Sequence, residues 1–166
     1  DIEGDVIRGW LDGNGNGGKM RGLDIGCGAN KTVSDAVGID LTERRLEGCS
    51  GGTKGAQSVA DVCAHALRLP FPDNSQDYII ARHVFEHLLD PVAALREWRR
   101  VLKADGLLLI AVPDEDRCRS ILLDWTHVHA YNPPSLLNLL ELSGFHMTGM
   151  AVIQPGMSFC MRAISA

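Results

Sequence analysis

The sequence lacks the features that mark membrane-spanning, secreted and nucleic-acid-binding proteins. It contains no apolar run long enough to cross a bilayer, and its acidic, mixed first ten residues do not resemble a signal peptide. Aspartate and glutamate outnumber lysine and arginine by 21 to 16, and a formal net charge of −5 disfavours broad nucleic-acid or membrane-surface binding. We therefore expect a cytoplasmic protein that binds neither nucleic acid nor membranes.

The cysteines form no disulfide or zinc pattern. The five of them stand at positions 27, 49, 63, 118 and 160, and no pair has the C-x-x-C spacing. Scattered cysteines in odd number are typical of reduced thiols in a cytosolic protein. We expect neither a disulfide framework nor a zinc site built on cysteine.

The chain has the length of one domain. Its 166 residues divide into a flexible N-terminal segment, residues 1–19, and a single domain, residues 20–166. The polar tract DGNGNGGK at the end of the first segment could not hold a helix. From residue 20 onward, short apolar runs alternate with helical patterns. The runs that we expect to be strands are residues 20–25, 36–40, 58–62, 77–82 and 106–112.

Two helices carry clear start signals. Asp90 can cap a helix that begins at Pro91, and Asn132 can cap a second helix. Two further runs, residues 145–153 and 158–165, are typical of a closing antiparallel pair. Strands that alternate with helices predict an α/β fold: a Rossmann-like, doubly wound, mostly parallel sheet with an antiparallel closing strand.

Two of the expected strands end on an aspartate near glycines. LDIGCG places Asp24 before Gly26 and Gly28, and VGID ends on Asp40. Glycine lets a backbone approach a ligand closely, and a carboxylate can accept hydrogen bonds from both hydroxyls of a ribose. The third glycine of a dinucleotide fingerprint is missing, because Lys31 stands there. Since Asp24 would repel a diphosphate but suit a cation, the pattern indicates a positively charged nucleoside.

These motifs resemble the class I S-adenosylmethionine-dependent methyltransferases, in particular the small type-11-like branch. The likeness covers roughly residues 20–150, through LDIGCG, VGIDL, LRLPFPDNSQDYIIARHVFEHLLDP, ALREWRRVLKADGLLLIAVPD and THVHAYNPPSLLNLLELSGF. It implies an enzyme that uses S-adenosylmethionine, releases S-adenosylhomocysteine and methylates a small-molecule or metabolite-like acceptor. Cover for the site would come from residues 1–19, the loop 113–132 or another subunit, which leaves a homodimer open.

Two alternatives from other classes remain. One is a non-catalytic, methyltransferase-like module that binds the cofactor or a partner. The other is a nucleotide-dependent oxidoreductase, which the missing third glycine and Asp24 disfavour.

The resemblance also implies roles for individual residues. Asp40 would bind the ribose hydroxyls, and Leu41 would pack against the adenine. His65 stands where the family usually has an adenine-binding acidic residue, so its ring, or the backbone of Ala64 and His65, would take over; Asp61 is the alternative. The full set of expected cofactor contacts is Asp24, Gly26, Cys27, Gly28, Asp40, Leu41, Ala64, His65, Arg82 and His83.

The stretch DWTHVHAY supplies the candidate catalytic residues. His127 or His129 could act as a general base or contact the substrate, because histidine titrates near neutral pH, or could only hold the loop by hydrogen bonds. With Asp124 the two histidines could also ligate an ion. No further ligand cluster is evident, so we expect no metal site. Glu86 and His87 open the helix after the fourth strand, and Glu86 is expected to fix its start.

Overall fold

The computed structural model describes residues 1–13, 20–42, 47–50, 53–153 and 157–166. Its elements, in chain order, are α1 (Ile2–Asp12), β1 (Gly22–Ile25), β2 (Val37–Asp40), β3 (Glu47–Ser50), β4 (Thr53–Gln57), β5 (Val62–Cys63), β6 (Gln76–Arg82), the 3-10 helix η1 (Phe85–His87), α2 (Pro91–Val101), β7 (Leu102–Pro113), α3 (Glu115–Cys118), α4 (Ser120–Leu123), α5 (Pro133–Leu142), β8 (Phe145–Ile153) and β9 (Ser158–Ser165). Among these described helices, none is long and apolar enough to cross a membrane.

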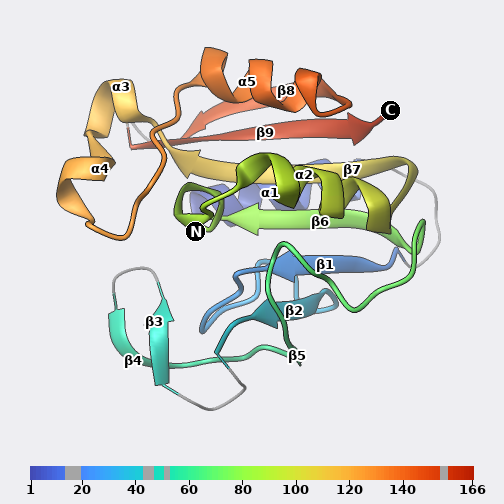
Figure 1. Ribbon diagram of the computed structural model, residues 1–166, viewed down its shortest axis with the longest axis horizontal. Helices are drawn as coiled ribbons and strands as arrows, with labels where there is room; N and C mark the ends of the chain where they lie inside the picture. Colours follow the sequence, from blue (N-terminus) through green and yellow to red (C-terminus); the bar gives the residue numbers. More distant parts are fainter. Residues whose placement is uncertain (14–19, 43–46, 51–52, 154–156) are drawn as a thin grey trace.

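A seven-stranded sheet forms the centre, with the order β5-β2-β1-β6-β7-β9-β8 (Figure 1). Strands β5, β2, β1, β6 and β7 run parallel to one another, and β9 lies antiparallel between β7 and β8. The chain moves outward from β1 to β2 and β5, then crosses back to β6 on the other side of β1. Open α/β sheets bind ligands where the strand order reverses, here at the carboxyl ends of β1 and β6. The predicted fold class is confirmed.

Both predicted helix caps are present. Asp90 Oδ1 accepts a hydrogen bond from Ala93 N at 2.9 Å, and Pro91 is the first residue of α2. Asn132 Oδ1 accepts from Ser135 N while Ser135 Oγ accepts from Asn132 N, each at 3.0 Å, which makes a capping box. These side chains bind amides that have no partner within the helix. The predicted closing pair, β8 and β9, is confirmed as well.

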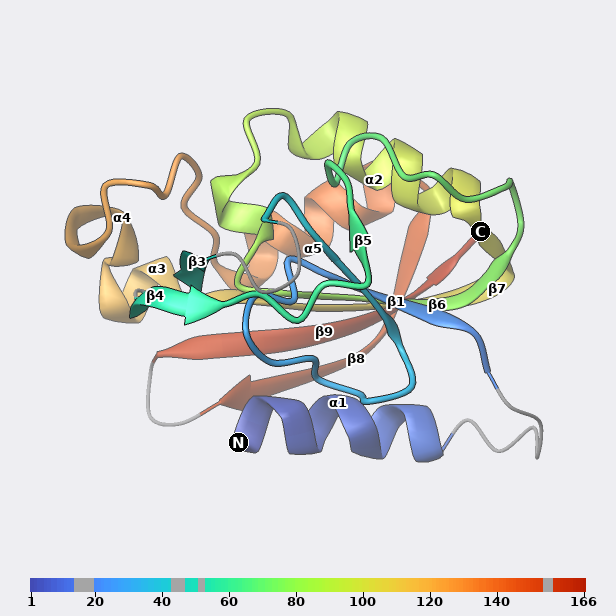
Figure 2. The same ribbon diagram turned by 90° about the horizontal axis from the view of Figure 1, so that it is seen from below.

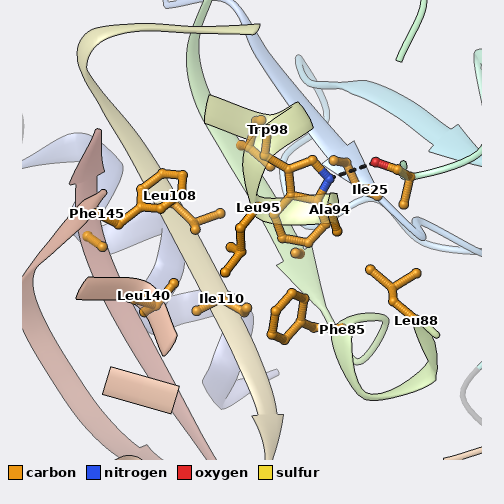
Figure 3. Packing of buried hydrophobic residues seen from close by; sticks show 14 of the residues in the cluster. Ile25, Phe85, Leu88, Ala94, Leu95, Trp98, Leu108, Ile110, Leu140 and Phe145 are labelled. Atoms are coloured by element: carbon orange, nitrogen blue, oxygen red, sulfur yellow. Dashed lines mark hydrogen bonds between the residues drawn. The ribbon is translucent and has the colours of Figure 1, made fainter. Parts of the chain in front are cut away.

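The larger part of the core lies between the sheet and the layer of α2 and α5 (Figures 2 and 3). Trp98, Leu95 and Phe85 are fully buried there. The indole nitrogen of Trp98 donates a hydrogen bond to the carbonyl oxygen of Ala66 at 2.9 Å, so its polar atom is satisfied. Because Phe85 is anchored in this core, η1 is fixed just beyond the carboxyl end of β6.

The second face of the sheet is covered by α1 (Figure 2). The prediction of a flexible segment at residues 1–19 is wrong for residues 2–12, which form this helix. Ile7 is fully buried and Leu11 is 7% exposed, both against apolar side chains of β6 and β7. The helical spacing of these apolar residues was missed because the glycine-rich tract that follows them indicated a flexible segment. Residues 14–19 lie outside the described residues.

One predicted strand needs correction, and one pair of strands was not predicted. The run 58–62 is mostly not a strand, because β5 contains only Val62 and Cys63. The preceding residues bind the neighbouring loop instead: Val59 N donates to the carbonyl oxygen of Gly28 at 2.9 Å. The antiparallel pair β3–β4, which was not expected, forms a separate two-stranded sheet.

Shortening a buried side chain tests whether α1 is an integral layer. Ile7→Ala should lower the free energy of unfolding by about 2–5 kcal/mol, because it leaves a cavity between α1 and the sheet. Ile2→Ala, at a 50% exposed position of the same helix, should change it by less than about 1 kcal/mol. Urea unfolding followed by tryptophan fluorescence measures both. Equally small effects would show that α1 does not contribute to the core.

Candidate functional site

The loop after β1 needs glycine at two positions. Gly26 has φ +69° and Gly28 has φ +51°, in the left-handed region that favours glycine. A Cβ on Gly26 would also lie 2.6 Å from Val84 Cγ2. Between the two glycines, Cys27 is buried, and this burial raises the pKa of its thiol to about 12. The loop therefore exposes backbone beside a neutral thiol at the carboxyl end of β1.

Asp40, the last residue of β2, is held by two backbone amides. Its Oδ2 accepts a hydrogen bond from Gly28 N at 2.8 Å, and its Oδ1 accepts from Thr42 N at 3.0 Å. Each carboxylate oxygen has capacity for a further hydrogen bond. The carboxylate is thus fixed between two strand ends and can still accept bonds from two hydroxyls.

Asp24 lies beneath the same loop and is 2% exposed. Its Oδ2 accepts a hydrogen bond from Thr32 N at 2.5 Å. Burial raises the pKa of Asp24 to about 6, although the bond from Thr32 acts in the opposite direction. Near neutral pH this carboxyl is mostly ionised, so it places a negative charge under the glycine loop.

Three of the expected adenine contacts lie next to Asp40. Leu41 is 66% exposed, an unusual position for a large apolar side chain. Ala64 N donates to the carbonyl oxygen of Asp40 at 3.0 Å. The exposed ring of His65 accepts a hydrogen bond from Leu67 N at its Nδ1, which leaves Nε2 available. The structure therefore brings these residues together at one edge.

Arg82 and His83 lie at the end of β6, but their partners come from the N-terminal end of α1. Arg82 Nη1 donates to both carboxylate oxygens of Asp1 at 2.7 Å. His83 Nε2 lies 2.9 and 3.0 Å from the two carboxylate oxygens of Glu3. Burial disfavours the imidazolium, but Glu3 and Glu86 outweigh it and raise the pKa of His83 to about 9. Sequence analysis missed these carboxylates because they stand about eighty residues away.

The two predicted catalytic histidines have different surroundings. The His127 side chain is 10% exposed, and its Nε2 lies 3.9 Å from Glu86 Oε1. Its Nδ1 is 3.1 Å from Ser120 Oγ. The ring of His129 instead lies beside Tyr131, with 6.0 Å between the ring centroids. Of these two predicted histidines, His127 is the one with a ring nitrogen facing a buried carboxylate.

Glu86 and His87 have a different environment from the one expected. They belong to η1, and Glu86 lies in its first turn as expected, but its carboxylate has no hydrogen-bond partner among the described residues, and α2 starts only at Pro91 with Asp90 as its cap. Glu86 is 1% exposed. The rings of His87 and His127 meet edge to face, with 4.7 Å between their centroids. The spacing H-x-x-E-H in the sequence is the signal that could have indicated this cluster.

The carboxyl edge of the sheet thus carries two groups of residues that can bind a ligand. Asp24, Asp40 and the exposed Leu41 can receive a nucleoside that carries positive charge. Beyond the end of β6, Glu86 and two imidazoles can bind a cation or exchange a proton.

Comparison with known proteins identifies relatives of this chain. The model of a methyltransferase domain (type 11) matches residues 23–110, more than half of the chain. The uncharacterized methyltransferase YcgJ of Bacillus subtilis is 39% identical over 99 residues, 54% of this chain and 39% of that protein. A demethylmenaquinone methyltransferase of Staphylococcus aureus is 32% identical over 100 residues, 54% of this chain and 42% of that protein. The chain therefore spans about two fifths of the length of these relatives.

Solved structures show the same fold. The structure of YcgJ matches with a TM-score of 0.68 at 21% identity and covers 98% of this chain and 95% of that one. An S-adenosylmethionine-dependent methyltransferase from Methanosarcina mazei matches with a TM-score of 0.68 at 20% identity and covers 93% and 96%.

The family match runs from β1 into β7, so it includes the glycine loop and Asp40 as well as the strands that carry them. The chain belongs to the methyltransferase-domain family and has the class I fold that its motifs predict.

Proposed function

We propose that this chain binds S-adenosylmethionine and transfers its methyl group to a small-molecule acceptor. The observation that carries the proposal is the Asp40 carboxylate, which two backbone amides hold between the ends of adjacent parallel strands. Family membership supports the reaction. A relative named as a demethylmenaquinone methyltransferase supports a small acceptor, and the net charge of −5 gives no general attraction to nucleic acids.

The proposed contacts follow the geometry of the loop. Asp40 accepts hydrogen bonds from the ribose hydroxyls with the lone pairs that Gly28 N and Thr42 N leave unused. Leu41 covers one face of the adenine with its exposed side chain. Asp24, buried beneath the loop, favours the positive charge of the methionine part.

Further contacts come from the two flanking strands. The backbone of Ala64, which is hydrogen-bonded to Asp40, or the ring of His65 accepts a hydrogen bond from the adenine amino group, because a neutral imidazole nitrogen is an acceptor. Arg82 and His83 border the methionine part from the end of β6.

S-adenosylmethionine, when bound, supplies an electrophilic methyl group on a sulfonium. The chain needs no metal for this displacement; it contributes orientation and exclusion of water. We place the acceptor on the side of α3 and α4, where His127 and His129 follow in the chain. There the Nε2 of His127 can contact an oxygen or nitrogen acceptor.

A second candidate is a binding module without catalysis. The ion pairs of Arg82 with Asp1 and of His83 with Glu3 occupy the end of β6, where the methionine part would lie. Transfer of a labelled methyl group to any acceptor would exclude this alternative, while cofactor binding alone would support it.

Removing the Asp40 carboxylate tests the cofactor site. Asp40→Ala should weaken binding of S-adenosylmethionine and of S-adenosylhomocysteine by at least about tenfold, because a charge-assisted hydrogen bond contributes about 1.5–3 kcal/mol. Asp12→Ala, at the other end of α1 from Glu3, should leave both affinities unchanged. Isothermal titration calorimetry measures them. Absence of binding by the unsubstituted protein, or equal binding by Asp40→Ala, would refute the proposed site.

The pKa of Asp24 predicts how binding depends on pH. Above about pH 6 the carboxylate is ionised and attracts the cationic ligand; as the pH falls through 6, protonation removes that attraction. Affinity for S-adenosylmethionine should therefore fall about threefold to tenfold between pH 7.5 and pH 5. Asp24→Asn should bind more weakly at pH 7.5 and show a flatter profile, while it keeps an oxygen for Thr32 N. Parallel pH profiles of the two proteins would argue against a role for this charge.

A further inference from the structure

Glu86, His87 and His127, here called the Glu86 cluster, are residue types that bind metals and lie just beyond the end of β6. Glu86 and His87 belong to η1, and His127 lies in the loop between α4 and α5. One possible ligand atom of each lies within 4.8 Å of the other two. Within the described ranges of the chain, no other group of three or more histidine, cysteine, aspartate or glutamate residues meets this distance.

The Glu86 carboxylate is buried and lacks hydrogen bonds. The residue is 1% exposed, and neither carboxylate oxygen has a hydrogen-bond partner in the part of the chain that the structure describes. His83 Nδ1 and His127 Nε2 lie 3.4 and 3.9 Å from its Oε1, too far for good hydrogen bonds. His83 also directs its other nitrogen to Glu3. A buried carboxylate is costly unless a cation approaches it closely. The His83 imidazolium provides charge on one side at 3.4 Å but no hydrogen bond, so the carboxylate can still bind a cation directly on the side of His87 and His127.

Both imidazoles of the cluster are oriented through Nδ1. His87 Nδ1 lies 3.2 Å from the carbonyl oxygen of Thr126 and 3.1 Å from its Oγ1. His127 Nδ1 lies 3.1 Å from Ser120 Oγ, which donates a hydrogen bond to Glu115 at 2.8 Å. A proton on Nδ1 leaves the lone pair on Nε2 free, and metal-binding histidines are commonly oriented by such outer contacts. Each ring thus keeps Nε2 available as a ligand atom.

We propose that the Glu86 cluster binds one divalent transition-metal ion, with Zn²⁺ as the best match. Two imidazoles and one carboxylate are a donor set typical of zinc sites that keep an open position. Ligand atoms about 2.0–2.1 Å from a tetrahedral ion lie about 3.4 Å apart, so atoms within 4.8 Å of one another have to close by at most about 1.4 Å. This proposal revises the expectation of no metal, which rested on the lack of a ligand cluster in the sequence.

The ion would keep at least one position for another oxygen. Asp124 Oδ2 lies 3.7 Å from His127 Nε2, and its side chain is 38% exposed, so it can approach as a fourth ligand or leave that place to water. In methyl transfer an acceptor hydroxyl could take the same position, where the ion would lower its pKa. That role rests on the proposed function, whereas the ion site itself does not.

Metal titration of chelator-treated protein tests the proposal without any cofactor. Calorimetry with Zn²⁺ should give one ion per chain, and Glu86→Gln and His127→Ala should each weaken binding at least about tenfold. His129→Ala, two residues away, should bind Zn²⁺ like the unsubstituted protein. Co²⁺ in the same site should show visible absorption typical of oxygen and nitrogen ligands, without the intense thiolate band that the exposed Cys63 would cause.

Several results would overturn the proposal: no Zn²⁺ binding, binding that both cluster variants retain, or a Co²⁺ spectrum with the thiolate band. Thermal unfolding checks that the variants are folded. Zn²⁺ should also raise the unfolding temperature of the unsubstituted protein, because a ligand that binds the folded state stabilises it. Titration with S-adenosylmethionine on the same samples keeps the two proposals apart. Cofactor binding without Zn²⁺ binding would leave the methyltransferase proposal intact, and the reverse result would leave only the metal site.

Discussion

The short connection between β1 and β2 is the constraint on which the site depends. Parallel strands usually need a crossover with a helix, but residues 26–36 contain none in the structure. Their backbone amides therefore lack a helical ladder, and carboxylates take its place: Asp24 binds Thr32 N, and Asp40 binds Gly28 N. The same carboxylates that a cationic nucleoside would meet are thus required to shape the loop. Folding of the loop and recognition of the ligand use one set of atoms.

A second set of charges joins the N-terminal end of α1 to the carboxyl edge. Glu3 contacts both His83, just after β6, and Ser158 on β9, so one half-buried carboxylate connects α1 with the ends of two strands. Asp1 adds an ion pair with Arg82. Because apolar contacts of Ile7 hold the rest of the helix, these polar contacts serve to position its end over the strand. The helix thereby closes the site on the side opposite α2 and α5.

The sequence predicted what local chemistry determines. Helix caps at Asp90 and Asn132 need only residues three positions away, and the apolar runs identify the central strands. Glycine spacing and Asp40 indicated, for the same reason, the edge of the sheet where we propose that the cofactor binds. Features that depend on distant partners were not predictable. These are the docking of α1, whose apolar side chains pack on strands far away in the sequence, and the burial of Glu86. An H-x-x-E-H spacing does not tell which side chain turns inward.

His83 connects the two halves of the carboxyl edge. Its Nε2 contacts Glu3, which faces the proposed methionine pocket, and its Nδ1 lies 3.4 Å from Glu86, which faces the proposed metal site. Its φ of +52° is uncommon for a histidine, and such strain persists only where the surroundings fix it. A methyl donor and its acceptor have to meet in line, so the residue between their sites has to be held rigidly. The ion pairs on both sides of His83 provide that rigidity.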